Sequence, residues 1–410
     1  MKKDLLTTGG ARIIVMVVSL LQGIIVARCL LDEGKGIISL YLVALNLTLA
    51  LGDMGGKQSY AYFMAKRGMA PRKTWKYIRF SLALAIVLEF VLLSGVLLSR
   101  GMTDRRMIVG ALMGIMTVKL YNSFSYSYAL ASRKIRLLNV CNVVAQVTTL
   151  AFVALFIGWL GKGEEWYFFG SLIGVSLVAI ILSWWRVQHF AESSISSNRE
   201  AFDWSLWREI TAKGFSYAIP LFIMGLNYRL DVFIIEYFRD EGTVGIYSQG
   251  ASLAQMLWLL PEVLALVIFS HSLNSVKEKK FANDLLRNLG KMMLAMGVLL
   301  APIGLAAYYL IPIVYGPSFE ESSWVFVVIL PGVYLMILFK SLNGDLAARG
   351  FPRIAGYVFL PAVVLNVVLN ILFIPNYGAV GAALASCISY SLAALVFFFV
   401  YRRMTAQLAD

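Results

Sequence analysis

Long apolar stretches alternate with short polar segments along the whole chain. Each apolar stretch runs for about 20 to 28 residues, a length that crosses a hydrocarbon core about 30 Å thick when the residues are helical. The pattern predicts twelve transmembrane helices, at about residues 5–30, 37–64, 77–99, 107–132, 137–159, 166–186, 211–238, 244–272, 288–314, 320–347, 354–374 and 378–401. The expected fold class is therefore an all-α polytopic membrane protein.

Composition excludes the main alternative, a soluble helical bundle with a large core. Hydrophobic residues make up 60% of the 410 residues and charged residues only 14%. A soluble domain carries about 25% charged residues. The mean hydropathy of +0.76 agrees with a chain that is mostly in lipid.

Basic residues are concentrated on one side of the predicted spans. With the N-terminus inside, the inner segments hold 24 of the 36 Lys and Arg residues and the outer loops hold six. The positive-inside rule then predicts a multi-pass protein of the cytoplasmic (inner) membrane with both termini cytoplasmic. The net charge of +13 reflects this topology and contact with anionic membrane lipids, so it does not indicate nucleic-acid binding.

An internal repeat divides the chain into two halves. The sequence DEG occurs at residues 32–34 and again at 240–242, and LFI occurs at 155–157 and again at 372–374. We predict two pseudo-symmetric six-helix bundles, residues 1–186 and 211–410, joined by a cytoplasmic linker at 187–210 that ends in an interfacial helix. Six spans return the chain to the same side, so the repeat is parallel, an arrangement that commonly binds substrate near mid-depth between the halves.

Charged side chains occur inside the predicted spans, where each costs roughly 2.5–3.5 kcal/mol on insertion scales. They should therefore face the bundle interior, water or one another. Helical spacing places many of them on polar stripes: Asn46, Asp53, Lys57 and Tyr60 in the second span, and Ser248, Ser252, Gln255 and Glu262 in the eighth. Such stripes predict a wet cavity drawn from both halves.

Some of these charges have alternative structural roles. Asp53 and Lys57 also form an i,i+4 pair that would suit a structural salt bridge. Asp345 lies at the inner end of its span, where local capping or pairing is an alternative. Glu89 has apolar helical neighbours, so we interpret it either as a protonatable coupling site or as a partner for Lys119.

Arg229 and Asp231 lie two residues apart, about 200° around a helix, so they cannot face the same way. One can line the cavity while the other contacts a neighbouring helix. We expect Arg229 to line the cavity.

Enzyme motifs are missing from the sequence. It has no P-loop, no H-E-x-x-H and no G-x-S-x-G motif, and its predicted outer loops of about 5–7 residues leave no room for a soluble catalytic domain. Its three cysteines and two histidines form no metal-binding spacing. We therefore expect no enzyme, no catalytic residues, no metal and no cofactor beyond a coupling ion, H⁺ or Na⁺.

Four segments resemble bacterial polysaccharide flippases. They are VARCLLDEGKGIISLY (26–41), GDMGGKQSYAYFMAKR (52–67), FSYAIPLFIMGLNYRLDVFIIEYF (215–238) and LNILFIPNYGAVGAALAS (369–386), the last being the most specific. Together with twelve spans in two similar halves, they make the chain similar to the multidrug/oligosaccharidyl-lipid/polysaccharide (MOP) flippase superfamily. Within it, the chain most resembles O-antigen-type, Wzx-like flippases.

The resemblance implies a MATE-like fold and the transfer of undecaprenyl-pyrophosphate-linked glycan repeat units from the cytoplasmic to the outer leaflet by alternating access, for O-antigen or other surface polysaccharide synthesis. Polysaccharide polymerase and chain-length machinery are the protein partners it implies. We expect substrate contacts at Arg12, Asn46, Lys57, Lys119, Asn122, Arg229, Gln255, Lys340 and Asn343. Ion-coupling or charge-balancing roles are expected at Asp53, Glu89, Asp231, Glu262 and Asp345. The alternatives are a MATE-like antiporter of small cations and a membrane glycan polymerase or transferase.

Overall fold

The computed structural model describes residues 2–132, 134–190, 202–259, 261, 279–348, 351 and 353–406, and these residues are almost entirely helical. The α-helices are α1 (Lys2–Gly52), α2 (Gly56–Arg67), α3 (Pro71–Ser99), α4 (Arg106–Ala131), α5 (Ile135–Phe152), α6 (Glu165–Phe190), α7 (Trp204–Phe238), α8 (Glu241–Gln255), α10 (Lys279–Tyr315), α11 (Glu320–Ala348) and α12 (Ile354–Ala406). A π-helical segment, Val153–Trp159, extends α5, and 3₁₀ turns at Met256–Trp258 and Pro317–Phe319 follow α8 and precede α11. The predicted all-α fold class is confirmed.

Two of these helices are too long for one membrane crossing, and each is broken once. The 51 residues of α1 contain a non-helical residue at Leu31 (φ 57°, ψ −162°), and the 53 residues of α12 contain one at Gly378 (φ 52°, ψ −130°). A straight helix of 50 residues would be about 75 Å long, more than twice the hydrocarbon thickness. The break at Leu31 falls between the predicted spans 5–30 and 37–64, and the break at Gly378 falls where the predicted span 378–401 begins after 354–374.

The number of spans is consistent with twelve. Among the described residues, nine helices are long and apolar enough to cross a membrane, and two of these nine contain the breaks at Leu31 and Gly378. The predicted span at 244–272 is described only to Pro261, because residues 262–278 lie outside the described ranges.

The break at Gly378 supports the internal repeat. Gly161, in the turn after the π-helical segment, also has a positive φ, of 60°. Gly161 and Gly378 are separated by 217 residues, the same offset that relates the two LFI segments at 155–157 and 372–374. Equivalent turns thus use glycine for a left-handed backbone at the same place in both halves.

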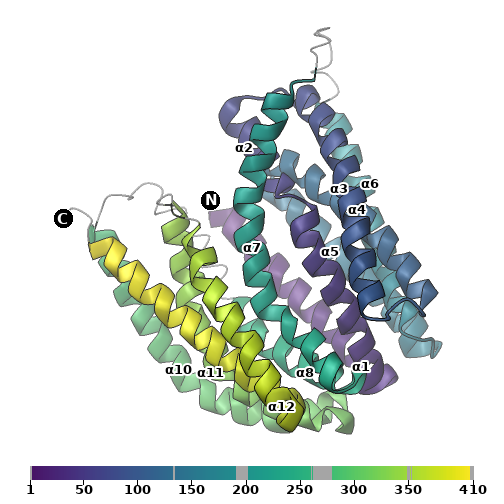
Figure 1. The fold of residues 1–410 in the computed structure, drawn as a ribbon, viewed down its shortest axis with the longest axis vertical. Coiled ribbons are helices and arrows are strands. Elements are labelled where there is room, and N and C mark those ends of the chain that lie inside the picture. The colour runs from purple at the N-terminus through teal and green to yellow at the C-terminus, as the bar shows by residue number, and fades with distance from the viewer. Residues whose placement is uncertain are drawn as a thin grey trace. The chain divides into compact units, whose positions relative to one another are not determined.

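The described chain forms two compact units, each with its own core. The first contains residues 1–25 and 41–222, and the second contains residues 26–40 and 223–410. In the first unit the rings of Tyr60 and Phe124 meet edge-on with centroids 5.9 Å apart. In the second, Phe339 packs against Phe359 and Phe397 at 4.7 and 4.8 Å. Figure 1 shows α11 and α12 side by side in that second unit.

The first turns of α7 pack with the first unit. The indole nitrogen of Trp207 donates to Ser81 Oγ at 3.0 Å, and Arg67 pairs with Glu209 at 2.9 Å. The ring of Phe202 stacks on Tyr77 at 4.6 Å. Residues 204–210, which the sequence assigned to an interfacial helix at the end of the linker, form the beginning of a continuous helix that ends at Phe238.

Residues 26–40 of α1 pack with the second unit instead of the first. A Cβ atom at Gly36 would meet the carbonyl oxygen of Glu241, and one at Gly245 would meet the carbonyl oxygen of Asp32. The contact is reciprocal, and it joins the two segments that carry the repeated DEG sequence. Nearby, Arg28 donates from Nε to the carbonyl of Val314 at 2.9 Å and so satisfies the C-terminal end of α10.

Candidate functional site

A glycine-rich turn in the first unit positions the predicted acid Asp53. The helix α1 ends at Gly52, and Met54 and Gly55 both have positive φ, of 50° and 64°. Asp53 Oδ1 accepts a hydrogen bond of 2.8 Å from the amide of Gly55, and Oδ2 accepts one of 2.9 Å from Ser123 of α4. The carboxylate thus closes the turn and ties it to α4.

This turn contradicts the predicted stripe along the second span. The i,i+4 and i,i+7 spacing of Asn46, Asp53, Lys57 and Tyr60 assumed one continuous helix, but the chain leaves the helix at Asp53 and begins α2 at Gly56. Tyr60 instead turns toward α3, where its hydroxyl bonds Ser81 Oγ at 2.7 Å. The amide of Asn46 donates to the carbonyl of Leu42 on its own helix at 2.7 Å.

Lys57 is held by an aromatic ring. Its ammonium lies 5.2 Å from the ring centroid of Tyr126 on α4, within the range of a cation–π contact. Lys57 is half-buried, so the charge retains access to a ligand. Ser123, which bonds Asp53, lies one turn before Tyr126 on the same helix, so α4 organises both charges.

Glu89 is fully buried on α3. Its carboxylate lies against Gly52, where any side chain would collide with it. At Gly52 the carboxylate of Glu89 therefore contacts the backbone of α1 and no side chain.

The second unit holds a dense polar cluster around Asp231. This residue is fully buried on α7, and its carboxylate accepts hydrogen bonds from Ser386 (2.5 Å) and Asn370 (2.7 Å) of α12 and from the hydroxyl of Tyr247 of α8. Asn366 extends the cluster, since its side-chain oxygen accepts from Asn370 at 3.0 Å. Three helices thus converge on one carboxylate.

Sequence reasoning missed the partners of Asp231. A signal was present, because Asn366 and Asn370 are spaced i,i+4 and Ser386 and Ser389 are spaced i,i+3, so each pair shares a helix face in an apolar span. Buried polar groups in lipid are expected to bond one another.

Arg229 and Asp231 indeed point in different directions. Asp231 has no exposed surface, whereas Arg229 is exposed. The buried acid therefore connects helices within the second unit, and the arginine remains accessible.

Two aromatic rings, those of Trp258 and Tyr228, lie against Lys340 of α11, and we call this group the lysine box. The ammonium lies 4.4 Å from the ring of Trp258 and 5.7 Å from that of Tyr228. Tyr228 also packs edge-on against Tyr390 with centroids 5.6 Å apart, and Tyr390 follows Ser386 by one helical turn. The lysine box and the Asp231 cluster are thus neighbours in one polar and aromatic region.

The other predicted residues contact a neighbouring helix, are half-buried or lie outside the described residues. Asn122 donates to the carbonyl of Val175 on α6 at 2.9 Å, and Asp345 accepts from Tyr401 of α12 at 2.6 Å. Arg12, Lys119, Gln255 and Asn343 are half-buried. Glu262 lies outside the described residues. Among the residues that the structure describes, no group of three His, Cys, Asp or Glu side chains could hold a metal ion.

Solved structures of other membrane proteins share this fold. It superposes on a multidrug resistance MATE family transporter of the MOP superfamily in an inward-facing conformation, with a TM-score of 0.75 over 96% of this chain and 94% of that one at 14% identity. It also superposes on the lipid II flippase MurJ in an inward closed conformation, with a TM-score of 0.74 over 96% and 87% at 14% identity. The chain therefore has the same fold as these two proteins.

The sequence identifies the family of the chain. Residues 1–273 match the family described as polysaccharide biosynthesis protein, and the chain belongs to this family.

Two curated relatives from Haloferax volcanii are also similar. They are a probable flippase, AglR, 26% identical over 263 residues, and a probable low-salt glycan biosynthesis flippase, Agl15, 26% identical over 181 residues. These matches cover 60% and 43% of this chain. The chain spans 51% and 38% of the length of the two relatives.

Proposed function

We propose that the protein is a flippase that moves a lipid-linked glycan across the membrane, rather than an enzyme. The observation that carries this proposal is membership of the polysaccharide biosynthesis protein family. A fold shared with a lipid II flippase supports it, as do relatives named as glycan flippases. The finer proposal is an undecaprenyl-pyrophosphate-linked repeat unit, moved from the cytoplasmic to the outer leaflet of the inner membrane for O-antigen or another surface polysaccharide.

The chemistry of the described side chains suits such a substrate. A pyrophosphate needs cations that remain accessible, and charge-assisted hydrogen bonds to it are stronger than neutral ones. Lys57 in the first unit and Lys340 in the second are half-buried and oriented by aromatic rings, and Arg229 is exposed. The rings of Trp258 and Tyr228 add apolar faces against which sugar rings can pack.

Coupling is proposed for Asp231 and Glu89. The cluster around Asp231 contains carboxylate and hydroxyl oxygens, which are among the ligands that hard cations prefer. A Na⁺ ion or a proton that binds there would rearrange contacts among α7, α8 and α12. Glu89 is the candidate proton site of the first unit, because it is buried against a backbone that leaves room for a neutral carboxyl group.

The test is deletion of the gene in its own host, followed by analysis of the lipid-linked glycan. We expect loss of surface glycan and accumulation of the lipid-linked precursor on the cytoplasmic side. Normal surface glycan would contradict the proposal. Normal glycan with greater sensitivity to cationic drugs would indicate a MATE-like antiporter, and shortened chains without trapped precursor would indicate a polymerase.

Complementation connects this function to the site. The deletion strain should recover with the unaltered protein and fail with a variant that carries both Lys57→Gln and Lys340→Gln. A matched variant, Lys291→Gln, alters an exposed lysine of α10 and should restore the glycan.

A further inference from the structure

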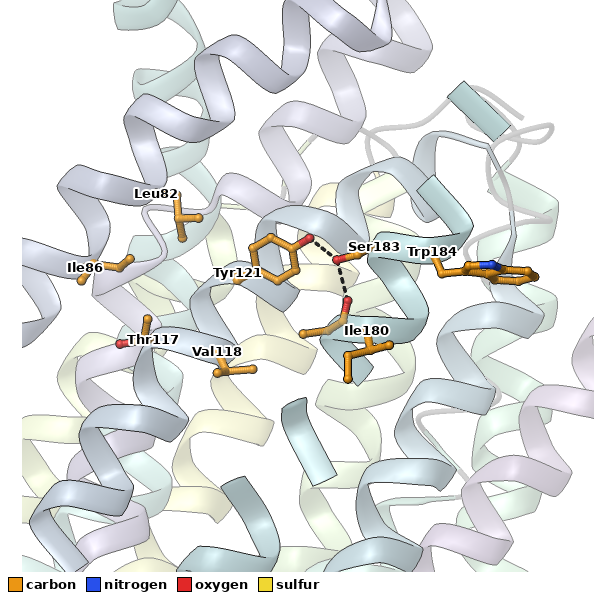
Figure 2. Close-up of a pocket in the computed structure, with 9 residues that line it drawn as sticks. Leu82, Ile86, Thr117, Val118, Tyr121, Ile180, Ser183 and Trp184 are labelled. Atoms are coloured by element: carbon orange, nitrogen blue, oxygen red, sulfur yellow. Dashed lines mark hydrogen bonds between the residues drawn. The ribbon is translucent and has the colours of Figure 1, made fainter. Parts of the chain in front are cut away.

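An apolar groove runs along the outer face of the first unit, between α3, α4 and α6 (Figure 2). It has a volume of about 640 Å³ and is lined by Leu82, Ile86, Thr117, Val118, Tyr121, Ala179, Ile180, Ser183 and Trp184. Ile180 and Trp184 at its edge are 64% and 65% exposed. All three helices are candidate membrane spans, so the groove opens toward lipid.

The hydroxyl groups in the groove already have partners. Thr117 donates to the carbonyl of Met113 at 2.9 Å, and Ser183 donates to that of Ala179 at 2.7 Å. Tyr121 and Ser183 hydrogen-bond each other, as Figure 2 shows. The groove therefore presents an apolar lining, which suits an aliphatic chain rather than a polar ligand.

One end of the groove meets a cation. The rings of Tyr121 and Trp75 meet edge-on with centroids 6.2 Å apart. The guanidinium of Arg186 stacks on the same Trp75 ring, 3.4 Å from its centroid. The Nη1 atom of Arg186 is buried and has no hydrogen-bond acceptor among the described residues. Arg186 as a whole is half-buried, so its positive charge can still act on an anion held at this end of the groove.

The surroundings of this end are basic. Arg79 is exposed and follows the same face of α3 as Leu82 and Ile86, at i, i+3 and i+7. Neither the segment KRGMAPRKTWKYIR at 66–79 nor the end of α6, WWRVQHF at 184–190, contains an acidic residue. The positive charge of these segments would therefore attract an anionic headgroup.

We propose that this groove is a binding site for one anionic phospholipid of the bilayer. Its acyl chain lies in the groove between α3, α4 and α6, and its phosphate lies beside the guanidinium of Arg186 at the Trp75 end. The site lies within the first unit and does not depend on what the protein transports.

Native mass spectrometry of the full-length protein tests the site with phosphatidylglycerol and with phosphatidylcholine of the same chains. We expect phosphatidylglycerol to bind more tightly, and Arg186→Gln to weaken that binding about tenfold, as expected for a lost charge-assisted hydrogen bond. The matched control Arg402→Gln removes an arginine that lies 5.9 Å from the Phe398 ring, outside the groove, and should leave binding unchanged.

A second variant tests the groove itself. Ala179→Trp fills the groove from its lining, so it should reduce retention of long-chain phosphatidylglycerol while the melting temperature without added lipid stays within a few degrees of the unaltered protein. Equal binding by Arg186→Gln and the unaltered protein would overturn the proposal. Arg186-dependent retention of undecaprenyl phosphate but not of phosphatidylglycerol would also overturn it, because the groove would then hold a polyprenyl lipid.

Discussion

Asp231 and Arg229 show how two charges on neighbouring positions of one helix acquire different roles. Asp231 accepts three hydrogen bonds from α8 and α12, whereas Arg229 is exposed. The sequence predicted the two faces correctly, because about 200° separates residues two apart on a helix. It did not predict the partners of Asp231, two of which, Asn370 and Ser386, lie 139 and 155 positions away in the sequence.

Removal of the Asp231 carboxylate should destabilise the second unit. Asp231→Ala leaves buried donors of Tyr247, Ser386 and Asn370 without their acceptor, so we expect a loss of about 3 kcal/mol in unfolding free energy. Thermal unfolding of the purified protein in detergent measures it. Asp284→Ala is the control, because Asp284 and Arg287 form an exposed pair 2.8 Å apart that should contribute about 1 kcal/mol at most. Equal losses in both variants would refute the structural role.

Lys340 tests the contribution of a single cation to transport. Lys340→Gln removes the charge from the Trp258 ring, and we expect flipping of the lipid-linked glycan in reconstituted vesicles to slow by about tenfold, as for one lost charge-assisted contact. Lys340→Arg keeps the charge and should retain most activity, because arginine also stacks on aromatic faces. Full activity of the glutamine variant would exclude Lys340 from substrate binding.

At the scale of elements, hydropathy located the spans well and missed where helices break. A span is predicted from a run of apolar residues long enough to cross the bilayer, and such a run is a local property of the sequence. The stripe through Asn46, Asp53 and Lys57 failed because GDMGG at 52–56 is a turn, not the interior of a helix. Glycines that follow an aspartate indicate a turn, but the surrounding apolar segment with helical spacing favours a continuous helix.

The turn itself can be tested with a pair of glycines. Gly55 and Gly68 have φ of 64° and 65°, but only Gly55 has a close neighbour, the carbonyl of Gly214, while a Cβ at Gly68 would meet nothing within 4 Å. Gly68→Ala should cost roughly 1 kcal/mol from backbone strain alone. Gly55→Ala should cost clearly more, and thermal unfolding measures the difference. Similar costs would mean that α7 can move away from the turn.

At the scale of the whole molecule, the chain passes between its two units inside helices. The passages fall at residues 25/26 and 40/41 of α1 and at 222/223 of α7. Hydropathy could not predict this, because it identifies spans one at a time and divides the chain at the longest loop. The sequence-based boundary between the two halves at residues 187–210 remains a prediction about which parts of the chain move against each other during transport.

Pro220 lies two residues before the passage in α7. A proline inside a helix removes a hydrogen bond and favours bending there. Pro220→Ala should therefore stiffen the connection and slow flipping several-fold without lowering the melting temperature. Pro361→Ala, which changes a proline within α12 of the second unit, is the control and should leave the rate less affected. Equal rates in both variants would argue against bending at Pro220.

Each of the two units contains a segment from the part of the chain that mostly forms the other. If the chain were expressed as two fragments, 1–190 and 202–410, the first would carry residues 26–40 of the second unit and the second would carry the start of α7, which packs with the first. Neither fragment could complete its core alone, so the pair should behave like a domain-swapped heterodimer. Co-expression of both fragments should restore surface glycan, whereas either fragment alone should not. Each unit would then require segments from both fragments in order to fold.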